Sequence, residues 1–232
     1  MSTTILRNPL YIGFTGAAKA GKDTAADALA FHLKSLGYNV LRMSFAEPLK
    51  KIGEIFGFTR EQMTDQNLKE VVDDFWGITP RKFMQLVGTE MFRNNLCHDC
   101  WVKLLIKRAQ MAIGQIPKYT GGSTPTINDA LRYRGNESVL WVPDAIVLIS
   151  DVRFENEAEG IIKEGGFVVR IKRPSLIQTD ESWRNHASEK MLAPIFVKAK
   201  IINDCSYNKY RSKVVEEFAT IFPPEMWNGA KS

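Results

Sequence analysis

The sequence lacks the features that mark secreted, membrane-spanning and fibrous proteins. Its 232 residues include only three cysteines, an odd number that fits a reducing compartment better than a disulfide framework. No apolar run approaches the roughly 20 residues that a membrane helix needs. The polar N-terminal stretch is followed by only a short apolar segment, unlike a secretory signal peptide. We therefore expect a cytosolic protein.

Concentrated charge is absent as well. The 31 Lys and Arg residues exceed the 26 Asp and Glu residues by only five, and they are spread along the chain. This balance indicates an anionic partner but not the basic stripe that a nucleic-acid duplex requires. Glycine and proline, at 16 and 10 residues, exclude a collagen-like chain, and 44% hydrophobic residues can bury a sizeable core.

The stretch from Cys97 to Cys100 reads Cys-His-Asp-Cys and has the spacing of half a zinc site. The second half is missing, because His32, His186 and Cys205 stand singly along the chain. The sequence therefore offers little support for a metal or redox role at this stretch.

Strand and helix patterns alternate at both ends of the chain. Apolar, β-branched runs predict strands, and apolar residues at helical spacing predict helices between them. Such alternation is typical of a parallel sheet with helices on both faces. We therefore predict an α/β fold with a parallel sheet of about five strands flanked by helices. The predicted strands are residues 10–15, 40–45, 145–150, 167–172 and 200–203, and the predicted helices are 22–36, 46–56, 80–94, 101–113, 155–164 and 207–222.

The middle of the chain is different. Residues 59–114 are almost wholly helix-patterned, and Thr79 and Pro80 have the N-cap and first-turn residue types that start a helix. Residues 115–143 are polar and rich in turn formers, which favours a long loop. We predict one domain, with a core over residues 1–56 and 144–232, a helical insertion over 57–114, a polar loop over 115–143 and a lid over about 173–194.

The strongest chemical signal lies at residues 16–24, Gly-Ala-Ala-Lys-Ala-Gly-Lys-Asp-Thr. Two glycines with a lysine directly after the second have P-loop spacing, and the motif stands between a predicted strand and a predicted helix. Small residues allow backbone N–H groups to converge on phosphate oxygens, while the lysine reaches the β- and γ-phosphates. The motif therefore predicts triphosphate binding rather than a merely tight turn. The residues expected to hold the nucleotide are Gly16, Ala18, Lys19, Ala20, Gly21, Lys22, Asp23 and Thr24.

Magnesium ligation is less clear, because Asp23 stands where P-loops usually carry the Ser or Thr that binds the ion. The Asp23 carboxylate could hold the ion through water, or Thr24 could take over. Asp151, at the end of a predicted strand, has the position of the acidic residue that faces the metal in P-loop sites, and Arg153 would share its sheet edge. In the alternative interpretation, Asp151 caps the next helix and Arg153 pairs with Glu157.

A kinase for a phosphate-bearing acceptor needs a second anion site. Arginine can grip a phosphate, and glutamine can recognise a base edge. Arg81, Gln85 and Thr89 fall on adjoining turns of one predicted helix. A basic amphipathic helix is usually just a solvated face, so both interpretations stay open. The candidates are Lys69, Arg81, Gln85, Thr89 and Arg93.

Several motifs occur in a characteristic order along almost the whole chain. In this order they resemble the bacteriophage deoxynucleoside monophosphate kinases. Gly-Lys-Asp-Thr, the Arg-x-x-x-Gln-x-x-Gly-Thr-Glu helix and Asp-x-Arg are uncommon outside that family, so the set is more specific than the P-loop alone. The motifs lie at residues 21–27, 45–50, 79–90, 101–103, 151–153, 173–174, 186–189 and 203–204.

The resemblance implies a fold like nucleoside monophosphate kinases, with an acceptor-binding helical region and a lid. Lys22, Arg153 and Arg173 would be catalytic, the two arginines closing over the transferring group, and Asn203 would join the P-loop in holding ATP. His186 and Glu189 could position the lid, or His186 could be an exposed polar residue of a loop; both interpretations stay open. Ala18 departs from relatives that carry a basic residue there. The acceptor pocket would comprise Phe45, Lys50, Lys69, Arg81, Gln85, Thr89, Arg93 and Trp101.

The reaction implied by the resemblance transfers the γ-phosphate of ATP, with Mg²⁺, to a deoxynucleoside monophosphate (dNMP), giving dNDP and ADP. The expected partners are these nucleotides, without membrane or nucleic acid, in the host cytoplasm for a phage-encoded chain; a homodimer is compatible with the sequence. Two alternatives stay open: a P-loop kinase of another small acceptor, and a nucleotide-binding regulatory NTPase. A guanine switch is disfavoured, because residues 208–211 read Asn-Lys-Tyr-Arg and lack the final Asp of a guanine reader.

Overall fold

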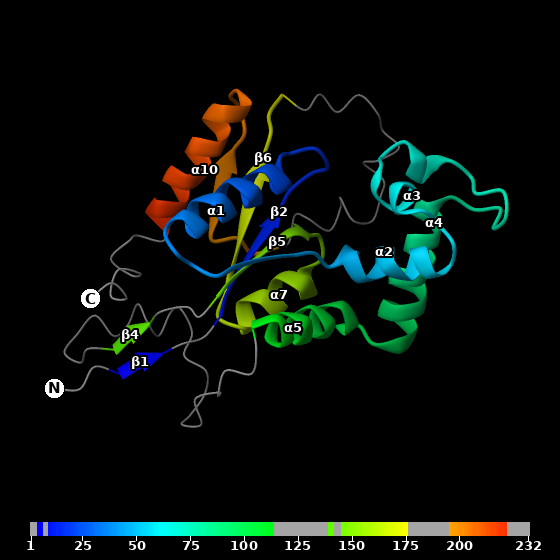
Figure 1. The fold of residues 1–232 in the computed structure, drawn as a ribbon, viewed down its shortest axis with the longest axis horizontal. Coiled ribbons are helices and arrows are strands. Elements are labelled where there is room, and N and C mark those ends of the chain that lie inside the picture. Colours follow the sequence, from blue (N-terminus) through cyan, green and yellow to red (C-terminus); the bar gives the residue numbers. More distant parts are fainter. Residues whose placement is uncertain (1–3, 7–8, 114–138, 142–144, 176–194, 222–232) are drawn as a thin grey trace. The chain divides into compact units, whose positions relative to one another are not determined.

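The computed structural model describes residues 4–6, 9–113, 139–141, 145–175 and 195–221 (Figure 1). The chain forms two compact units. The core unit comprises Met1–Met43 and Arg108–Ser232, and the helical unit comprises Ser44–Lys107. The helical unit begins before the predicted insertion over residues 57–114, because α2 (Ala46–Ile55) packs with the other helices of that unit. An acceptor-binding role for the insertion stays a prediction.

The central sheet of the core unit has five strands in the order β3-β5-β2-β6-β7. Every pairing in it is parallel. The α/β fold class and the five-stranded parallel sheet are therefore confirmed, and each strand lies at or near its predicted bounds. The strands are β2 (Leu10–Thr15), β3 (Val40–Met43), β5 (Ile146–Val152), β6 (Phe167–Lys172) and β7 (Ala199–Ile202).

Helices cover both faces of this sheet (Figure 1). Side chains alternate between faces along a strand, so Ile12 and Phe14 of β2 pack into the main apolar cluster with α1 (Lys22–Ser35) and α10 (Tyr207–Ile221). Gly13 faces the other side, where a Cβ would lie 2.8 Å from Ile161 of α7 (Glu155–Lys163). Because β2 is buried throughout, it presents the loop that follows it from a fixed scaffold.

A second, two-stranded sheet corrects one part of the predicted polar loop. β4 (Val139–Trp141) is a strand and pairs in parallel with β1 (Thr4–Leu6). Loop composition did not reveal it, because a three-residue strand is too short to show alternation. Residues 114–138 and 142–144 of the predicted loop lie outside the described residues.

The helical unit surrounds its own apolar cluster. Buried Phe58, Met63, Phe83 and Val87 form this cluster, against which Leu49 and Ile52 of α2 pack. The predicted cap is confirmed, because the Thr79 side chain accepts a hydrogen bond from the Lys82 N–H and Pro80 starts the helix. Besides α2, the helices are α3 (Arg60–Thr64), η1 (Leu68–Glu70), α4 (Pro80–Gln85), η2 (Leu86–Leu96) and the first part of α5 (Cys100–Ile113).

The helix predicted over residues 80–94 changes type part-way. It is α-helical in α4 and π-helical in η2. A π-helix bonds residue i to i+5 and is wider than an α-helix. Within η2, the Gly88 carbonyl accepts a hydrogen bond from the Trp101 indole at 2.8 Å. The side-chain face that starts with Arg81 therefore does not continue through η2 at α-helical spacing.

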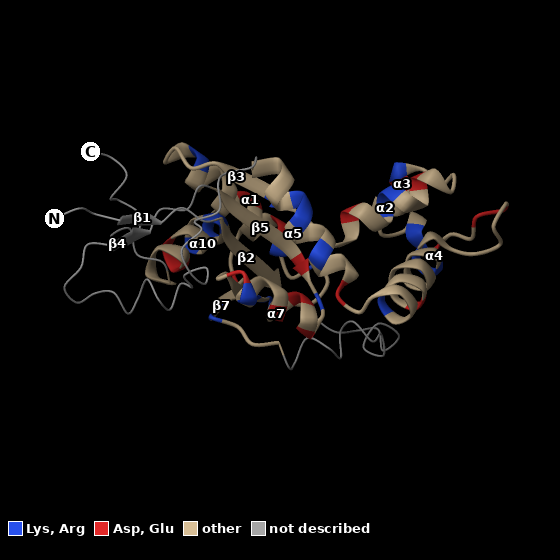
Figure 2. Ribbon diagram, turned by 90° about the horizontal axis from the view of Figure 1, so that it is seen from below, with Lys and Arg blue, Asp and Glu red and all other residues tan. Residues whose placement is uncertain are grey.

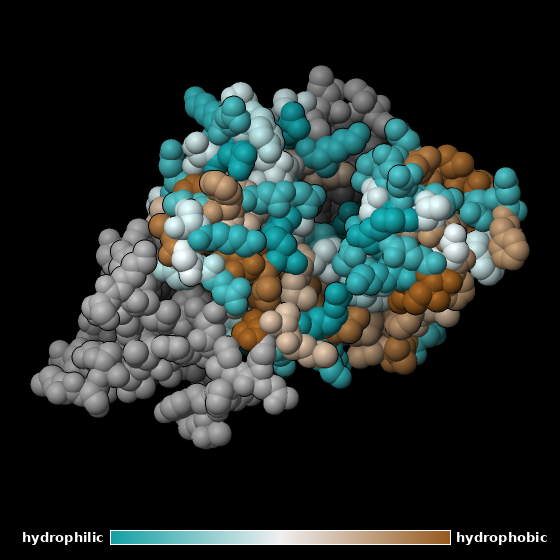
Figure 3. Space-filling view, in the orientation of Figure 1, coloured by the Kyte–Doolittle hydropathy of each residue, from teal (hydrophilic) through white to brown (hydrophobic). Residues whose placement is uncertain are grey.

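The surface of the helical unit carries exposed apolar side chains, visible as brown atoms in Figure 3. Phe75 is 84% exposed and packs edge-on against Trp76, with 5.0 Å between the ring centroids. Basic and acidic residues are mixed over both units in the view of Figure 2. Among the described residues, no helix has both the length and the apolar character needed to cross a bilayer.

Candidate functional site

The loop between β2 and α1 has the backbone that its glycines predict. Gly16 and Gly21 have φ of 143° and 100°, a region that side chains rarely adopt. A Cβ on Gly16 would lie 2.3 Å from the Ile171 carbonyl oxygen, so β6 leaves no space for a side chain. Lys19 also has a positive φ, 60°. The loop therefore turns tightly onto the start of α1, as a phosphate-binding loop must.

The Lys22 side chain folds back over this loop. Its ammonium group donates hydrogen bonds to the carbonyl oxygens of Gly16 at 2.7 Å and Ala17 at 2.8 Å. Hydrogen bonds in which the donor or the acceptor is ionised are roughly twice as strong as neutral ones, and a triphosphate adds a charge–charge attraction that a carbonyl group lacks. A triphosphate on the loop can therefore compete for the ammonium group, which already lies at the loop.

Two side chains from distant segments hold the second half of the loop. The Asn203 amide donates to the Ala20 carbonyl at 2.9 Å, and the Tyr210 hydroxyl donates to the Gly21 carbonyl at 3.2 Å. Burial raises the pKa of Tyr210 above its ordinary value, so its hydroxyl stays a neutral donor. These bonds come from the residue that follows β7 (Ala199–Ile202) and from α10, and they fix the loop against the rest of the core unit.

A cavity of about 350 Å³ opens beside the loop, entirely within the core unit. This volume is within the range of small-molecule sites. Arg173, after β6, brings a cation to its wall, with Nη1 3.5 Å from the Lys19 carbonyl oxygen. The cavity lies where strands end at their carboxyl edge, the usual ligand position in open α/β sheets. It is lined by Lys19, Gly21, Lys22, Asp23, Thr24, Arg173, Asn203, Cys205, Tyr207 and Tyr210.

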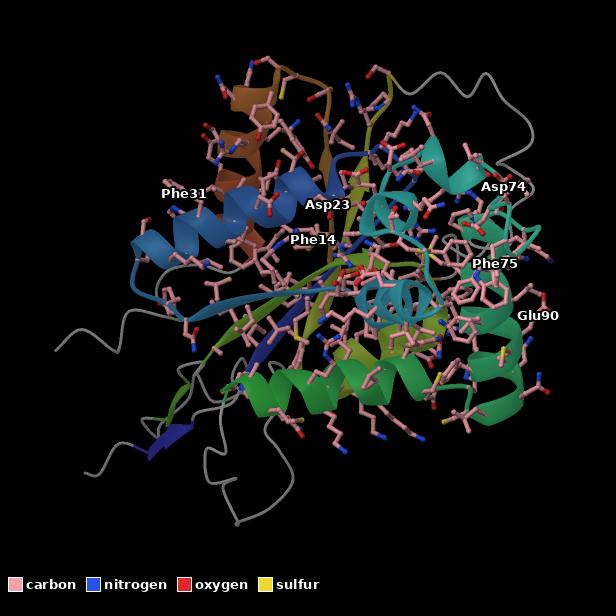
Figure 4. The ribbon with its side chains drawn as sticks, turned by 45° about the vertical axis from the view of Figure 1, so that its right-hand side comes forward. Phe14, Asp23, Phe31, Asp74, Phe75 and Glu90 are labelled. Carbon is pink, nitrogen blue, oxygen red and sulfur yellow. The ribbon has the colours of Figure 1, made fainter. Side chains whose placement is uncertain are left out.

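Asp23, in the first turn of α1 (Figure 4), is held by groups from two strands. The Ser150 hydroxyl of β5 donates to its carboxylate at 2.5 Å, and the Arg42 guanidinium of β3 lies 3.7 Å from it. Arg42 also pairs with Asp27 at 3.2 Å. Magnesium prefers oxygen ligands and is usually held by one or two carboxylates together with substrate phosphates. Asp23 and Thr24 on the cavity wall fit that requirement.

The residue of β5 that donates to Asp23 is Ser150, the neighbour of Asp151 in the sequence. Consecutive side chains of a strand point to opposite faces, so the two residues of β5 are directed differently. Glu157 caps the start of α7, because its carboxylate accepts from the backbone N–H groups of Arg153 and Phe154 at 2.8 and 3.1 Å. Arg153 is exposed and is not among the residues that line the cavity. The metal role of Asp151 and the catalytic role of Arg153 stay predictions.

One relative covers nearly the whole chain. It is a protein of Acanthamoeba polyphaga mimivirus named "Putative deoxynucleotide monophosphate kinase", 35% identical over 210 residues that span 89% of this chain and 91% of that protein. This chain belongs to the same family, a family of P-loop kinases. This membership confirms the kinase part of the expected resemblance. The relative comes from a mimivirus, and a bacteriophage origin of this chain stays a prediction.

No protein-family model matches the chain. Solved structures that it resembles include the Mycobacterium tuberculosis APS kinase CysC in complex with AMPPNP and APS, at 10% sequence identity. That match covers 90% of this chain and 97% of that chain, with a TM-score of 0.43. Another is the dephospho-CoA kinase from Campylobacter jejuni, at 14% sequence identity. That match covers 92% of this chain and 97% of that chain, with a TM-score of 0.40. The fold of this kinase is established by its own sheet order and loop.

In the helical unit of the kinase, the predicted acceptor residues fall into two groups. Arg81 and Gln85 lie on α4, and Thr89 follows on η2. The Arg81 guanidinium forms an ion pair with the Glu70 carboxylate of η1. These residues, with Lys50 and Lys69, retain solvent access. They are the part of the predicted acceptor set that a ligand could reach directly.

The second group is buried. Trp101 and Phe45 are each 6% exposed, and Arg93 is 7% exposed. The Trp101 ring packs against Phe92, 5.2 Å between centroids, while its indole N–H bonds Gly88. Stacking of an acceptor base on these rings therefore stays a prediction, and their visible role is to pack the unit.

Most of the predicted lid lies outside the described residues. This holds for residues 176–194, which include His186 and Glu189. Arg173 is described, and it lines the cavity as its expected place near the transferring group requires. Its catalytic role stays a prediction.

Sequence reasoning missed several residues of the site. Ser150 and Arg42 both contact Asp23 and both lie in predicted strands, but the sequence analysis gave neither of them a functional role. Tyr207 and Tyr210 lie one helical turn apart at the start of α10, directly after β7. The rule that ligands bind at the carboxyl ends of strands could have indicated both tyrosines. The same rule could have indicated Cys205, which lies between β7 and α10 and lines the cavity.

Proposed function

We propose that this kinase transfers the γ-phosphate of ATP to a deoxynucleoside monophosphate, giving a deoxynucleoside diphosphate and ADP. The observation that carries the proposal is the Lys22 ammonium on the glycine loop beside the cavity, in a chain 35% identical to the mimivirus protein with that name. The loop supplies the donor site, and the name of the relative supplies the acceptor class.

In the proposed mechanism, the loop amides and Lys22 bind the donor phosphates. The Lys22 ammonium exchanges its bonds to the Gly16 and Ala17 carbonyls for phosphate oxygens. Asn203 and Tyr210 keep the loop carbonyls turned toward the protein. Tyr207 and Arg173 line the same cavity with planar groups, on which a nucleotide base can stack.

Asp23 and Thr24 would hold Mg²⁺ beside these phosphates, with Ser150 fixing the Asp23 carboxylate. The ion would neutralise charge on the β- and γ-phosphate oxygens. The residues present fit the ion because they offer hard oxygen donors on the cavity wall.

The acceptor needs binding rather than activation. A monophosphate is already an anionic nucleophile, so no strong general base is required, and the main tasks are alignment and charge stabilisation. Arg81, Gln85, Lys50 and Lys69 of the helical unit are proposed to bind it. Arg173 is proposed to stabilise the charge that spreads over the transferring group.

The experiment incubates the protein with ATP, Mg²⁺ and each deoxynucleoside or ribonucleoside monophosphate in turn, and measures ADP and the new diphosphate. We expect at least one deoxynucleoside monophosphate to raise ADP formation well above the control without acceptor. The panel also gives the base preference and the deoxy-to-ribo ratio. ADP formation that no monophosphate stimulates would favour a regulatory NTPase, and stimulation by a different small acceptor would favour another P-loop kinase.

A further inference from the structure

The Cys-His-Asp-Cys stretch connects η2 to α5 within the helical unit. Cys97 follows the last residue of η2, and Cys100 is the first residue of α5. The Cys100 N–H donates to the Cys97 carbonyl at 3.0 Å, which closes a β-turn between them. The Cα atoms at the ends of a β-turn lie within about 7 Å, and a disulfide spans about 4.4–6.8 Å. Both cysteines are free thiols and partly exposed.

We infer that Cys97 and Cys100 form a reversible dithiol–disulfide site that reacts with low-molecular-weight disulfides. The turn holds the two sulfurs in one short loop, so that closing the bond needs no movement of a distant segment. Among the described residues, no group of three or more Cys, His, Asp or Glu side chains is arranged to hold a metal ion. The turn between Cys97 and Cys100 and their free thiols favour thiol chemistry for this pair.

Lys103 provides the second observation at this site. Its ammonium group, one turn along α5, donates to the Cys97 sulfur at 3.4 Å. A cation beside a cysteine sulfur stabilises the negative charge that the sulfur carries when it attacks a disulfide. Cys97 also lies outside the helix, where a small disulfide can approach it. The geometry thus makes Cys97 the attacking sulfur.

Cys100 has the character of the resolving thiol. Burial raises the pKa of the Cys100 thiol above its ordinary value, and the nearby Cys97 sulfur adds to this effect. Cys100 therefore loses its proton less readily than an ordinary cysteine thiol, which suits the resolving role. The guanidinium of Arg93 acts in the opposite direction and lowers the pKa of Cys100.

The reaction with glutathione disulfide as the oxidant has two steps. First, the Cys97 thiolate attacks one sulfur of the disulfide, forms a mixed disulfide and releases one glutathione thiolate, which takes a proton. Next, Cys100 loses its proton to solvent and attacks the Cys97 sulfur, releasing the second glutathione. The net change converts two protein thiols and one glutathione disulfide into one protein disulfide and two glutathione thiols.

The disulfide would lock the connection between the elements that carry Arg93 and Trp101. Trp101 follows Cys100 directly and bonds the Gly88 carbonyl in η2, so the disulfide would add a covalent link to a hydrogen bond that already joins the two elements. An effect on acceptor use rests on the proposed function. The chemistry of the pair does not, and the first experiment below therefore measures no activity.

The full chain is incubated in buffers with graded ratios of glutathione disulfide to glutathione, and thiols are blocked and mapped by mass spectrometry. We expect a Cys97–Cys100 cross-link, recognised by the loss of two hydrogen atoms from one peptide, and full reversal by reductant. Cys100→Ser should stop at one bound glutathione on Cys97, because its resolving thiol is gone. Cys97→Ser should react much more slowly. No cross-link at any ratio, or a faster reaction at Cys205, would overturn the inference.

A second set of variants tests the role of Lys103. Lys103→Gln should slow the reaction of Cys97 several-fold, while Lys103→Arg should restore it by keeping the cation. Lys107→Gln is the matched control, since Lys107 is an exposed lysine one further turn along α5. Equal rates for Lys103→Gln and Lys107→Gln would remove Lys103 from the site.

An activity measurement then separates regulation from chemistry. If the helical unit binds the acceptor as proposed, oxidised protein should show a changed KM for the monophosphate and an unchanged KM for ATP, and reductant should reverse the change. Cross-linking without any kinetic change would retain the dithiol site and contradict its regulatory effect. Failure of every acceptor would count against the proposed function alone.

Discussion

The Ser150 hydroxyl donates a hydrogen bond to the Asp23 carboxylate at 2.5 Å, joining two residues that are 127 positions apart in the sequence. Asp23 occupies the P-loop position that usually contributes a metal-binding hydroxyl. The bond orients the carboxylate on the cavity wall, and Arg42 adds a cation 3.7 Å from it. The strand β5 therefore contacts the end of the P-loop motif through an uncharged serine.

Replacing this serine should weaken the use of magnesium. A hydrogen bond to a charged group contributes about 1.5–3 kcal/mol. Because Asp23 retains solvent access, we expect the lower end of this range. Ser150→Ala should therefore raise the Mg²⁺ concentration for half-maximal turnover about tenfold. Binding of a fluorescent ATP analogue, titrated with and without Mg²⁺, checks the origin of the effect. Ser35→Ala, at the end of α1, is the control. An equal loss of analogue binding in the absence of Mg²⁺ would assign Ser150 to the loop instead.

Gly21 and Gly37 provide a matched pair of positive-φ glycines. An alanine at either position costs about 1–2 kcal/mol in backbone strain. Only Gly21 also faces a neighbour, because its Cβ would lie 2.6 Å from the Asn203 amide nitrogen, while nothing lies within 4 Å at Gly37.

Gly21→Ala should therefore lose ATP affinity by at least about tenfold, equivalent to 1.4 kcal/mol or more. Gly37→Ala should lose stability by the same backbone strain of about 1–2 kcal/mol, but it should keep its ATP affinity. Calorimetric titration with ATP and thermal unfolding measure the two quantities. Similar ATP affinities in the two variants would show that the Asn203 contact does not shape the loop.

Tyr210→Phe removes the hydrogen bond to the Gly21 carbonyl without changing the packing of the ring. One such bond contributes about 1 kcal/mol, so ATP affinity and the free energy of unfolding should both fall by amounts of this order. Tyr11→Phe is the control, since the buried Tyr11 hydroxyl has no hydrogen-bond partner among the described residues. It should be neutral or slightly stabilising. A larger stability loss in Tyr11→Phe than in Tyr210→Phe would contradict this account.

Arg81→Ala tests acceptor binding by the helical unit. The variant removes a cation that pairs with Glu70, and we expect the KM for the monophosphate to rise about tenfold or more, as for the loss of a charge-assisted contact. The KM for ATP should stay close to that of the parent protein. Lys82→Ala, at the exposed neighbouring position on α4, is the control. Parallel losses for both substrates would indicate a structural role for the Arg81–Glu70 pair.

Local patterns predicted the strand, loop and helix from Leu10 to Ser35, because each of those elements is specified by adjacent residues. They also predicted the parallel sheet, since buried strands alternate with helices. They could not identify Ser150 as the partner of Asp23, nor Tyr210 as the partner of Gly21, which is 189 positions away. Such pairs depend on strand order and helix packing, which local patterns do not encode.

The helical unit shows a second limit of sequence reasoning. Regular α-helical spacing placed Arg81, Gln85 and Thr89 on one face, whereas η2 is π-helical and carries Thr89 in a wider turn. Residue type also suggested base stacking for Trp101, which stays a prediction. The burial of Trp101 and its bond to Gly88 arise from tertiary packing, which residue type does not reveal.

The central claim is that a phosphate group moves from ATP on the Lys22 loop to a nucleotide acceptor. The most direct test follows a radiolabelled γ-phosphate in the presence of a deoxynucleoside monophosphate. We predict that the label appears in the diphosphate and not as inorganic phosphate, and that Lys22→Ala lowers this transfer at least about a hundredfold, while Lys34→Ala, on the last turn of the same helix, leaves it unchanged. Label released only as inorganic phosphate, or transfer that survives in Lys22→Ala, would contradict the account.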